Sequence, residues 1–332
     1  MYRFLDRACH GLLAWALATC LVAPFSPALA EHGSTSRPAP ATPHDHSTHS
    51  PASAHTPSPG PYSVVDDAGR TITLGAPATR IVTLAPHLTE LVAAVGGAER
   101  LVGVSRFSDF PLEVQKLPVV SDAYAVNLEA VALLKPDLIV AWRAGMSLRQ
   151  LNRLATLGIP VYESEVDGVP AIASTLQRLG VLLGTQEEAG KEAARQLALW
   201  QGLQERYAGR ATVRVFYQVS VDPLMTVNAR HIVSQTLTGC GGRNVFAQLP
   251  TLVATVSWEA AAQADPQLIV TGDTADRKAS LGQWPALTQV SAVRGHEYAW
   301  IDPSLLGRMG PRFIDGAAEL CAAIDMARQK RP

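Results

Sequence analysis

Side chains that could carry out catalysis are few in this sequence and do not form a known arrangement. It contains no nucleophile elbow, phosphate loop, HExxH run or CxxC pair, and the glycines around Cys240 lack the spacing of a dinucleotide fingerprint. A hydrolase using Cys240 or Asp302 is the most distant alternative, because nothing assembles an acid, a base and an oxyanion hole. We therefore predict a non-enzyme with no catalytic residue, no resident cofactor and no metal site in its folded part.

A second set of side chains suits binding rather than catalysis. In open α/β sheets, ligands bind beyond the carboxyl ends of the strands. The residues expected there include aromatic, thioether and charged types, a mixture that fits a large, partly apolar ligand with polar edges. The candidates are His87, Phe107, Tyr124, Trp142, Met225, Val253 and Arg308. Plainer roles stay open for them, such as capping the core, bracing a turn or capping a helix.

The elements that would position these side chains alternate between strand and helix. Asp66 to Gly69 predicts a hairpin turn between two β-prone runs, and residues 88–95 predict a helix that stops at Gly96. Further short apolar runs are separated by helical stretches, which favours parallel α/β layers. These runs are residues 81–84, 101–104, 119–120, 138–141 and 161–162.

An internal repeat indicates two related lobes. Residues 128–140 read as a short helix with Glu129 near its start, a turn marked by proline, and a buried strand. Residues 258–270 repeat this pattern with Glu259, at a constant offset of 130 residues.

A long helix is predicted between the two halves. Thr185 and Glu188 have the spacing of a capping box, and apolar residues recur at helical spacing as far as about Tyr207. Such a helix is about 33 Å long. We predict an N-terminal lobe over 61–184, a linking helix over 185–208 and a C-terminal lobe over 209–330. A single helical crossover predicts a stiff molecule.

The first 60 residues read as an export signal and a tether. Residues 1–30 combine two arginines, an apolar run and a small-residue cleavage pattern, which is typical of a signal peptide. Cys20 lies in a near match to a lipoprotein box, so lipid anchoring is a lesser alternative. Residues 31–60 are rich in Pro, Ser, Thr, Ala and His, which predicts a disordered linker with weak metal capture.

Composition narrows the classes further. The net charge of −1 provides no basic surface for nucleic acid, and no apolar stretch is long enough to span a membrane. Export also determines which cysteines the mature protein keeps. Cleavage after residue 30 leaves only Cys240 and Cys321. Two thiols in an oxidising compartment are expected to pair, here between two helical segments.

Several segments resemble the periplasmic cobalamin-binding proteins of ABC importers, and the match covers about residues 78–325. One motif, LLKPDLIVAW, is shared by the wider helical-backbone group that also binds ferric siderophores and haem, whereas SDFP, AWRAG and CGGRNVFA narrow the resemblance to cobalamin. The matching segments are TRIVTLAPHLTELVAAVG, VGVSRFSDFP, NLEAVALLKPDLIVAWRAG, RVFYQVSVDPLMTVN and CGGRNVFA.

The resemblance implies two Rossmann-like α/β lobes, with mainly parallel sheets, joined by one long backbone helix. It implies that cobalamin or a related corrinoid, as transported ligand, lies in the cleft between them. Tyr124 would substitute for an aromatic side chain missing at Ala123. Cys240 and Cys321 fall where family members form a disulfide. The corrin would be surrounded by Phe107, Trp142, Met225, Val253 and Arg308.

The resemblance also implies a task. Glu129 and Glu259 match the two surface carboxylates that dock on arginines of an inner-membrane ABC permease. The expected protein is thus the periplasmic substrate-binding component of a cobalamin importer. A haem or ferric-siderophore binder of the same fold remains an alternative, with His87 as the iron ligand for haem. An exported zinc-handling protein that uses the histidine tract remains another.

Overall fold

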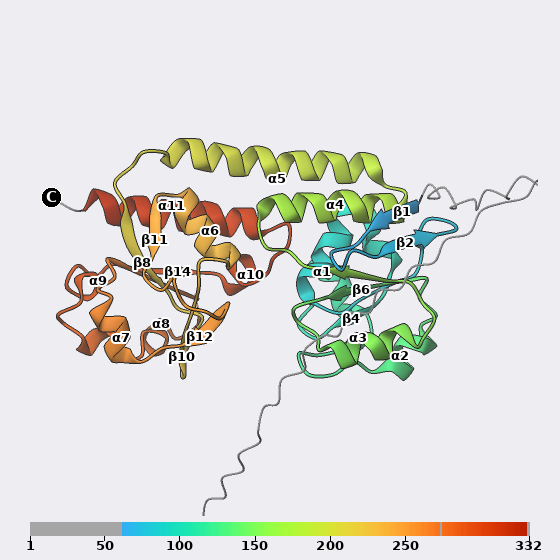
Figure 1. Cartoon of the computed structure of the whole chain (residues 1–332), viewed down its shortest axis with the longest axis horizontal. Helices are drawn as coiled ribbons and strands as arrows, with labels where there is room; N and C mark the ends of the chain where they lie inside the picture. The colour runs from blue at the N-terminus through green and yellow to red at the C-terminus, as the bar shows by residue number, and fades with distance from the viewer. Residues whose placement is uncertain (1–61, 273, 331–332) are drawn as a thin grey trace, which may run out of the picture. The chain divides into compact units, whose positions relative to one another are not determined.

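The computed structural model describes residues 62–272 and 274–330 (Figure 1). The predicted signal peptide (1–30), the possible lipidation site Cys20 and the predicted linker (31–60) lie outside the described residues. Over the described ranges, no helix is long and apolar enough to cross a membrane.

The first lobe is built on a five-stranded parallel sheet with the strand order β5-β4-β3-β6-β7. Its central strands are almost wholly buried, which explains why they read as unbroken apolar runs. An antiparallel hairpin precedes this sheet, and Gly69 has a φ of +78° in its turn. The strands are β1 (Tyr62–Val65), β2 (Thr71–Leu74), β3 (Ile81–Thr83), β4 (Leu101–Ser105), β5 (Val119–Ser121), β6 (Leu138–Trp142) and β7 (Val161–Ser164).

The second lobe is built on a four-stranded parallel sheet with the order β11-β8-β13-β14. A small antiparallel sheet with the order β12-β10-β9 accompanies it. The strands are β8 (Val213–Tyr217), β9 (Ser220–Val221), β10 (Leu224–Val227), β11 (Gly242–Asn244), β12 (Val253–Thr255), β13 (Leu268–Gly272) and β14 (Tyr298–Ile301). The two parallel sheets confirm the α/β fold class.

Helices connect the strands in both lobes. Those of the first lobe are α1 (Pro86–Val92), α2 (Leu128–Leu133), α3 (Leu148–Ala155) and α4 (Val169–Leu183). Those of the second lobe are α6 (Ile232–Gly239), α7 (Trp258–Gln263), α8 (Arg277–Ser280), α9 (Ser291–Arg294), α10 (Pro303–Leu306) and α11 (Phe313–Gln329).

The first helix begins two residues before its predicted start, and the helical segment stops at Gly96 as predicted. The helix α1 begins at Pro86 because the fixed φ of proline suits the first turn, where no intrahelical partner for its nitrogen is needed. It ends at Val92, and a π-helical turn over Ala93–Gly97 follows, in which Gly96 has a φ of +81°.

The internal repeat corresponds to equivalent packing in the two lobes. Asn127 and Ser257 both cap their helices by accepting a hydrogen bond from the backbone N–H three residues on. Lys135 and Asp265 both have positive φ after the helix, and their carbonyls accept from Arg80 Nε and Arg214 Nε at 3.2 and 2.9 Å. The strands that follow, β6 and β13, occupy equivalent places: β6 pairs with β3 and β13 pairs with β8, the strand that comes first along the chain in each parallel sheet.

The long helix α5 (Gln186–Tyr207) joins the lobes, as the sequence predicted. It packs on α4 and on both α6 and α11 (Figure 1). The buried residues along it belong to one continuous apolar cluster that runs from Leu183 in the first lobe through Ala193 to Leu320 in the second.

The predicted capping box at the start of α5 is wrong. Thr185 is the N-cap residue, but its side chain accepts no capping hydrogen bond and its Oγ1 is buried without a partner. The reason is its backbone, with φ −120° and ψ +41°, which departs from the extended conformation that a capping side chain requires. A capping box does form at α3, between Ser147 and Gln150.

The predicted disulfide is present. Cys240 and Cys321 are bonded and lie at the end of α6 and within α11, with their Cα atoms 5.0 Å apart. Both side chains are buried in the core of the second lobe. The bond therefore fastens two helices that pack on the same sheet and on α5.

Removing this disulfide should destabilise the protein without changing its fold. The bond closes a loop with a sequence separation of 81 residues, for which the loss of chain entropy in the unfolded state amounts to about 4 kcal/mol. We expect urea unfolding of the Cys240→Ser/Cys321→Ser double variant of residues 31–332 to show a lower midpoint. The free energy of unfolding obtained from that curve should be lower by this amount.

The parent protein, oxidised and unfolded in guanidinium, should give no free thiol with Ellman's reagent. Two titratable thiols per chain would show that the pair is not formed in solution.

Candidate functional site

The first lobe has a pocket at the carboxyl ends of its strands, where the sequence placed the ligand-binding side chains. Phe107 follows β4, Ala123 follows β5 and Trp142 ends β6, and all three line a volume of about 180 Å³. Parallel strands bring their carboxyl ends to one edge of the sheet, which is why residues far apart in the chain meet here. The lining is largely apolar.

Trp142 forms a wall of this pocket and is held on two sides. The ring of His87 contacts it edge-on, with ring centroids 5.3 Å apart. A Cβ atom at Gly145 would lie only 2.1 Å from an indole carbon, so only glycine allows the backbone to lie against the ring. The Nε1 of Trp142 is buried with no hydrogen-bond partner.

His87 supports the pocket from beneath rather than lining it. Its residue exposure is 4%, and its Nε2 is buried and unpartnered. Burial, and secondarily the positive charge of Arg308, lowers the pKa of His87 to about 3. The imidazole is therefore neutral at physiological pH. The structure brings His87 to Trp142 but not to the surface of the pocket.

Phe107 projects from a tight turn after β4. It has a φ of +68°, which is uncommon for a residue with a side chain, and the side chain is 71% exposed. Ser108 fixes the next position, because its hydroxyl lies 3.0 Å from Thr89 Oγ1 and 3.1 Å from Ser105 Oγ. The guanidinium of Arg106 lies 5.4 Å from the Phe107 ring centroid.

The second lobe has a corresponding pocket of about 530 Å³ at the carboxyl ends of β8 and β13. Gln218 stands behind it, donating to Thr271 Oγ1 at 3.0 Å and accepting from the indole of Trp284 at 2.9 Å. These bonds satisfy a buried amide. Val219 follows β8, Thr271 and Gly272 end β13, and all three line this pocket.

Met225 and Val253 lie on neighbouring strands of the small antiparallel sheet. Val253 of β12 is directly opposite Val227 of β10, and Met225 is two residues before Val227. Side chains two residues apart, and those directly opposite, share a face of a sheet. The register therefore puts Met225 and Val253 on the same face, with Met225 half-buried and Val253 exposed.

Arg308 lies where the loop after α10 meets the first lobe. Its Nη1 donates to Glu90 Oε1 at 3.1 Å and to Asp109 Oδ1, and its Nη2 donates to Asp109 Oδ2 and to the Phe107 carbonyl, both at 3.1 Å. The side chain is mostly buried. All of these acceptors belong to the first lobe, so Arg308 connects residues about 200 positions apart in the chain.

A second arginine completes this junction. Arg312 donates to both carboxylate oxygens of Glu90, at 3.0 and 2.6 Å, and its guanidinium lies 4.2 Å from the ring centroid of Phe110. Glu90 is the buried centre, with 2% of its side chain exposed. A buried carboxylate requires such partners, because an unpaired one is costly to desolvate. We call Glu90, Asp109, Arg308 and Arg312 the lobe-junction cluster.

Tyr124 does not join the first-lobe pocket, although the sequence singled it out. It is 90% exposed and lines a neighbouring hollow beside α3. Asp122 Oδ1 accepts from the backbone N–H groups of Tyr124 and Ala125, which sets this turn. Ala123 lines the first-lobe pocket instead.

The two glutamates of the internal repeat are exposed and occupy equivalent places. Glu129 is in the first turn of α2, and Glu259 is in the first turn of α7. Hydrogen bonds from its own backbone N–H and from Ser257 lower the pKa of Glu259. Neither glutamate is part of a strand-end pocket.

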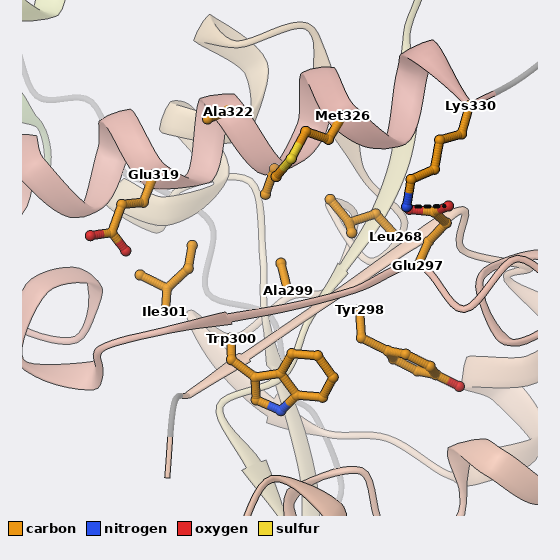
Figure 2. A pocket seen from close by; sticks show the side chains of 11 residues that line it. Leu268, Glu297, Tyr298, Ala299, Trp300, Ile301, Glu319, Ala322, Met326 and Lys330 are labelled. Atoms are coloured by element: carbon orange, nitrogen blue, oxygen red, sulfur yellow. Dashed lines mark hydrogen bonds and ion pairs between the residues drawn. The ribbon is translucent and has the colours of Figure 1, made fainter.

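Another hollow, of about 400 Å³, lies away from both strand-end pockets. Figure 2 shows it at the edge strand β14 and helix α11, with Ile301 and Met326 between the strand and the helix and the ring of Trp300 on the other side of the strand. The Glu297–Lys330 ion pair also lines it. It shares no lining residue with either strand-end pocket. We do not include it in the candidate site.

Within residues 62–272 and 274–330 no group of three His, Cys, Asp or Glu residues could hold a metal ion. His231 caps α6, because its Nδ1 accepts from Val233 N at 3.2 Å, and burial lowers its pKa to about 4.

The sequence analysis missed Glu90, Asp109, Arg312 and Gly145. Gly145 carried a signal, because it is the last residue of the AWRAG motif that contains Trp142. Glu90 reads as an ordinary helix residue in TELVAAV, and its partners are more than 200 residues away. No local pattern could have joined them.

The sequence and the structure were compared with known proteins. Residues 81–304 match the family described as periplasmic binding protein. The vitamin B12-binding protein of Vibrio cholerae serotype O1 (El Tor Inaba N16961) is 33% identical over 76% of this chain and 92% of the relative. That of Salmonella typhimurium LT2 is 38% identical over 74% of this chain and 90% of the relative.

Solved structures give the same fold. The periplasmic vitamin B12 binding protein BtuF of Vibrio cholerae superposes with a TM-score of 0.72 at 34% identity, covering 77% of this chain and 99% of that one. A periplasmic heme binding protein from Pseudomonas aeruginosa gives a TM-score of 0.67 at 27% identity, covering 77% and 94%. From the family match and from these relatives, the chain belongs to the periplasmic binding protein family.

Proposed function

We propose that this protein captures cobalamin or a related corrinoid in the periplasm and delivers it to an inner-membrane ABC permease. The observation that carries the proposal is the aromatic wall of Trp142 and Phe107 at the strand ends, in a chain whose relatives at 31–38% identity are vitamin B12-binding proteins. The predicted signal peptide (1–30) supplies the export, and the protein acts by binding rather than by catalysis.

The ligand would be held between the two lobes rather than within one. The first-lobe pocket of about 180 Å³ is smaller than the roughly 300–1,000 Å³ that is usual even for drug-sized ligands. A corrinoid is larger still, so it needs the strand-end pockets of both lobes. Trp142 and Phe107 would cover one part of the macrocycle, and Met225 and Val253 would contact another.

The electrostatics favour a neutral ligand. In the lobe-junction cluster two arginines meet two carboxylates, so Arg308 and Arg312 offer no unpaired charge to the carboxylates of haem or of an anionic siderophore. Haem also needs an accessible axial ligand, whereas the imidazole of His87 is buried behind Trp142. The haem-binding relative from Pseudomonas aeruginosa keeps haem as the second candidate.

Docking on the permease would use Glu129 and Glu259. Each is exposed near the start of an equivalent helix, one helix in each lobe, and the two helices share the pattern EAxA. Two equivalent acidic positions suit a partner that presents two equivalent basic positions. Neither glutamate touches the strand-end pockets, so docking and ligand capture use different surfaces.

Calorimetric titration of residues 31–332, free of metal, should show one-to-one binding of cyanocobalamin with submicromolar affinity and weak binding of hemin. The same protein titrated with Zn²⁺ serves as the control for the histidine tract. Tight hemin binding that His87→Ala weakens, without heat from cobalamin, would refute the proposal. Stoichiometric zinc as the sole ligand would favour the zinc-handling alternative.

Trp142→Ala should lower cobalamin affinity by about 30-fold, because a buried aromatic wall at the centre of an interface contributes most to binding. Gly145→Val should lower it as well, since the new side chain would displace the indole. The matched control is Trp200→Ala on α5, whose indole packs near Gly239 and away from both pockets. Equal loss of affinity in Trp142→Ala and Trp200→Ala would indicate a general loss of folding.

Replacing both docking glutamates should separate transport from binding. Glu129→Arg with Glu259→Arg is expected to abolish cobalamin uptake in cells that depend on it, while calorimetry shows unchanged affinity. The control exchanges two other exposed glutamates, Glu113 and Glu319, for arginine. Normal uptake by the first double variant would contradict the docking assignment.

A further inference from the structure

Phe107 is the side chain of the first-lobe pocket whose position depends most on other groups. It stands in a turn with positive φ and with most of its ring exposed. Ser108 anchors the following position in a buried group of hydroxyls with Thr89 and Ser105. The Phe107 carbonyl accepts a hydrogen bond from Arg308 of the second lobe, at 3.1 Å.

Arg308 has its terminal nitrogens fully occupied by first-lobe acceptors. Nη1 donates to Glu90 and Asp109, and Nη2 donates to Asp109 and to the Phe107 carbonyl. Each terminal nitrogen carries two hydrogens, so the four bonds use all four donors. The guanidinium therefore holds the turn and has no terminal donor left for a ligand.

Asp109 aligns this guanidinium. Both of its carboxylate oxygens accept from Arg308, which is the bidentate geometry that fixes orientation as well as distance. The hydrogen bond and charge of Arg308 lower the pKa of Asp109, so the carboxylate is ionised at neutral pH. Glu90 holds Arg308 from the buried side and is itself held by Arg312.

We infer that Asp109 and Arg308 are positioning residues for ligand binding: they hold the Phe107 turn across the two lobes, so that its ring is presented to the ligand. This inference rests on the proposed function for the identity of the ligand. The hydrogen bonds of Arg308 to Asp109 and to the Phe107 carbonyl are independent of it. It also changes the role expected for Arg308, from a group that touches the corrinoid to one that acts through Phe107.

A double-mutant cycle tests the inference. Calorimetry with cyanocobalamin compares the parent protein, Asp109→Asn, Phe107→Ala and the double variant. If Asp109 acts through the Phe107 ring, Asp109→Asn should weaken binding about tenfold in the parent but by less than about twofold once the ring is absent. Asparagine keeps the size of the side chain and removes the charge that aligns Arg308.

An equal loss of affinity in both backgrounds would overturn the inference, because it would mean that Asp109 or a released Arg308 acts on the ligand directly. Unchanged affinity in Asp109→Asn would overturn it too. The matched control is Asp325→Asn, which disturbs the ion pairs of that aspartate with Arg210 and Arg328, neither of which lines a strand-end pocket. We expect it to leave cobalamin affinity unchanged.

A measurement without ligand separates this inference from the proposed function. Hydrogen exchange of the peptide that covers residues 105–110 should be about tenfold faster in Asp109→Asn than in the parent, and unchanged in Asp325→Asn. If the parent protein fails to bind cobalamin, the proposed function fails while this comparison still stands. Equal exchange in parent and Asp109→Asn would overturn the positioning role itself.

Discussion

The buried carboxylate of Glu90 is the contact on which the arrangement of the candidate site depends. It lies in the first lobe and is neutralised by two arginines of the second, so neither lobe alone satisfies it. Removing one member of a buried ion pair costs about 3–5 kcal/mol, because the remaining charge stays desolvated. Gly310 allows the second-lobe loop to lie close to Glu90, since a Cβ atom at that position would be 3.3 Å from Glu90 Oε2. Gln196 of α5 adds a third tie by donating to the Pro311 carbonyl at 2.6 Å.

The strand-end pockets of the two lobes follow from parallel sheet geometry. Each lobe opens a pocket at the carboxyl ends of its strands, and the lining differs between them. The first lobe supplies aromatic rings, one of them supported by a neutral buried histidine. The second supplies a larger pocket and a small antiparallel sheet that carries Met225 and Val253.

The internal repeat explains how one chain provides two similar surfaces outside the site. A capping side chain, a residue with positive φ after the helix and an arginine–carbonyl hydrogen bond recur at matching positions in both lobes. These local interactions set the direction of α2 and α7 relative to β6 and β13. Glu129 and Glu259 are therefore exposed by the same packing in each lobe, whereas the strand-end loops of the two lobes have diverged.

The sequence by itself determined the fold class, the long helix, the repeat, the cysteine pair and most of the strand-end side chains, because these depend on periodicity, spacing and local turn chemistry. It identified Phe107 and Trp142, which line the first-lobe pocket. Only the tertiary structure decided that Tyr124 lies outside the first-lobe pocket and that His87 is buried. It also decided that Arg308 is bound to Glu90 and Asp109. These outcomes depend on contacts between residues up to about 220 positions apart, where the energy comes from burial and charge pairing that no local pattern records.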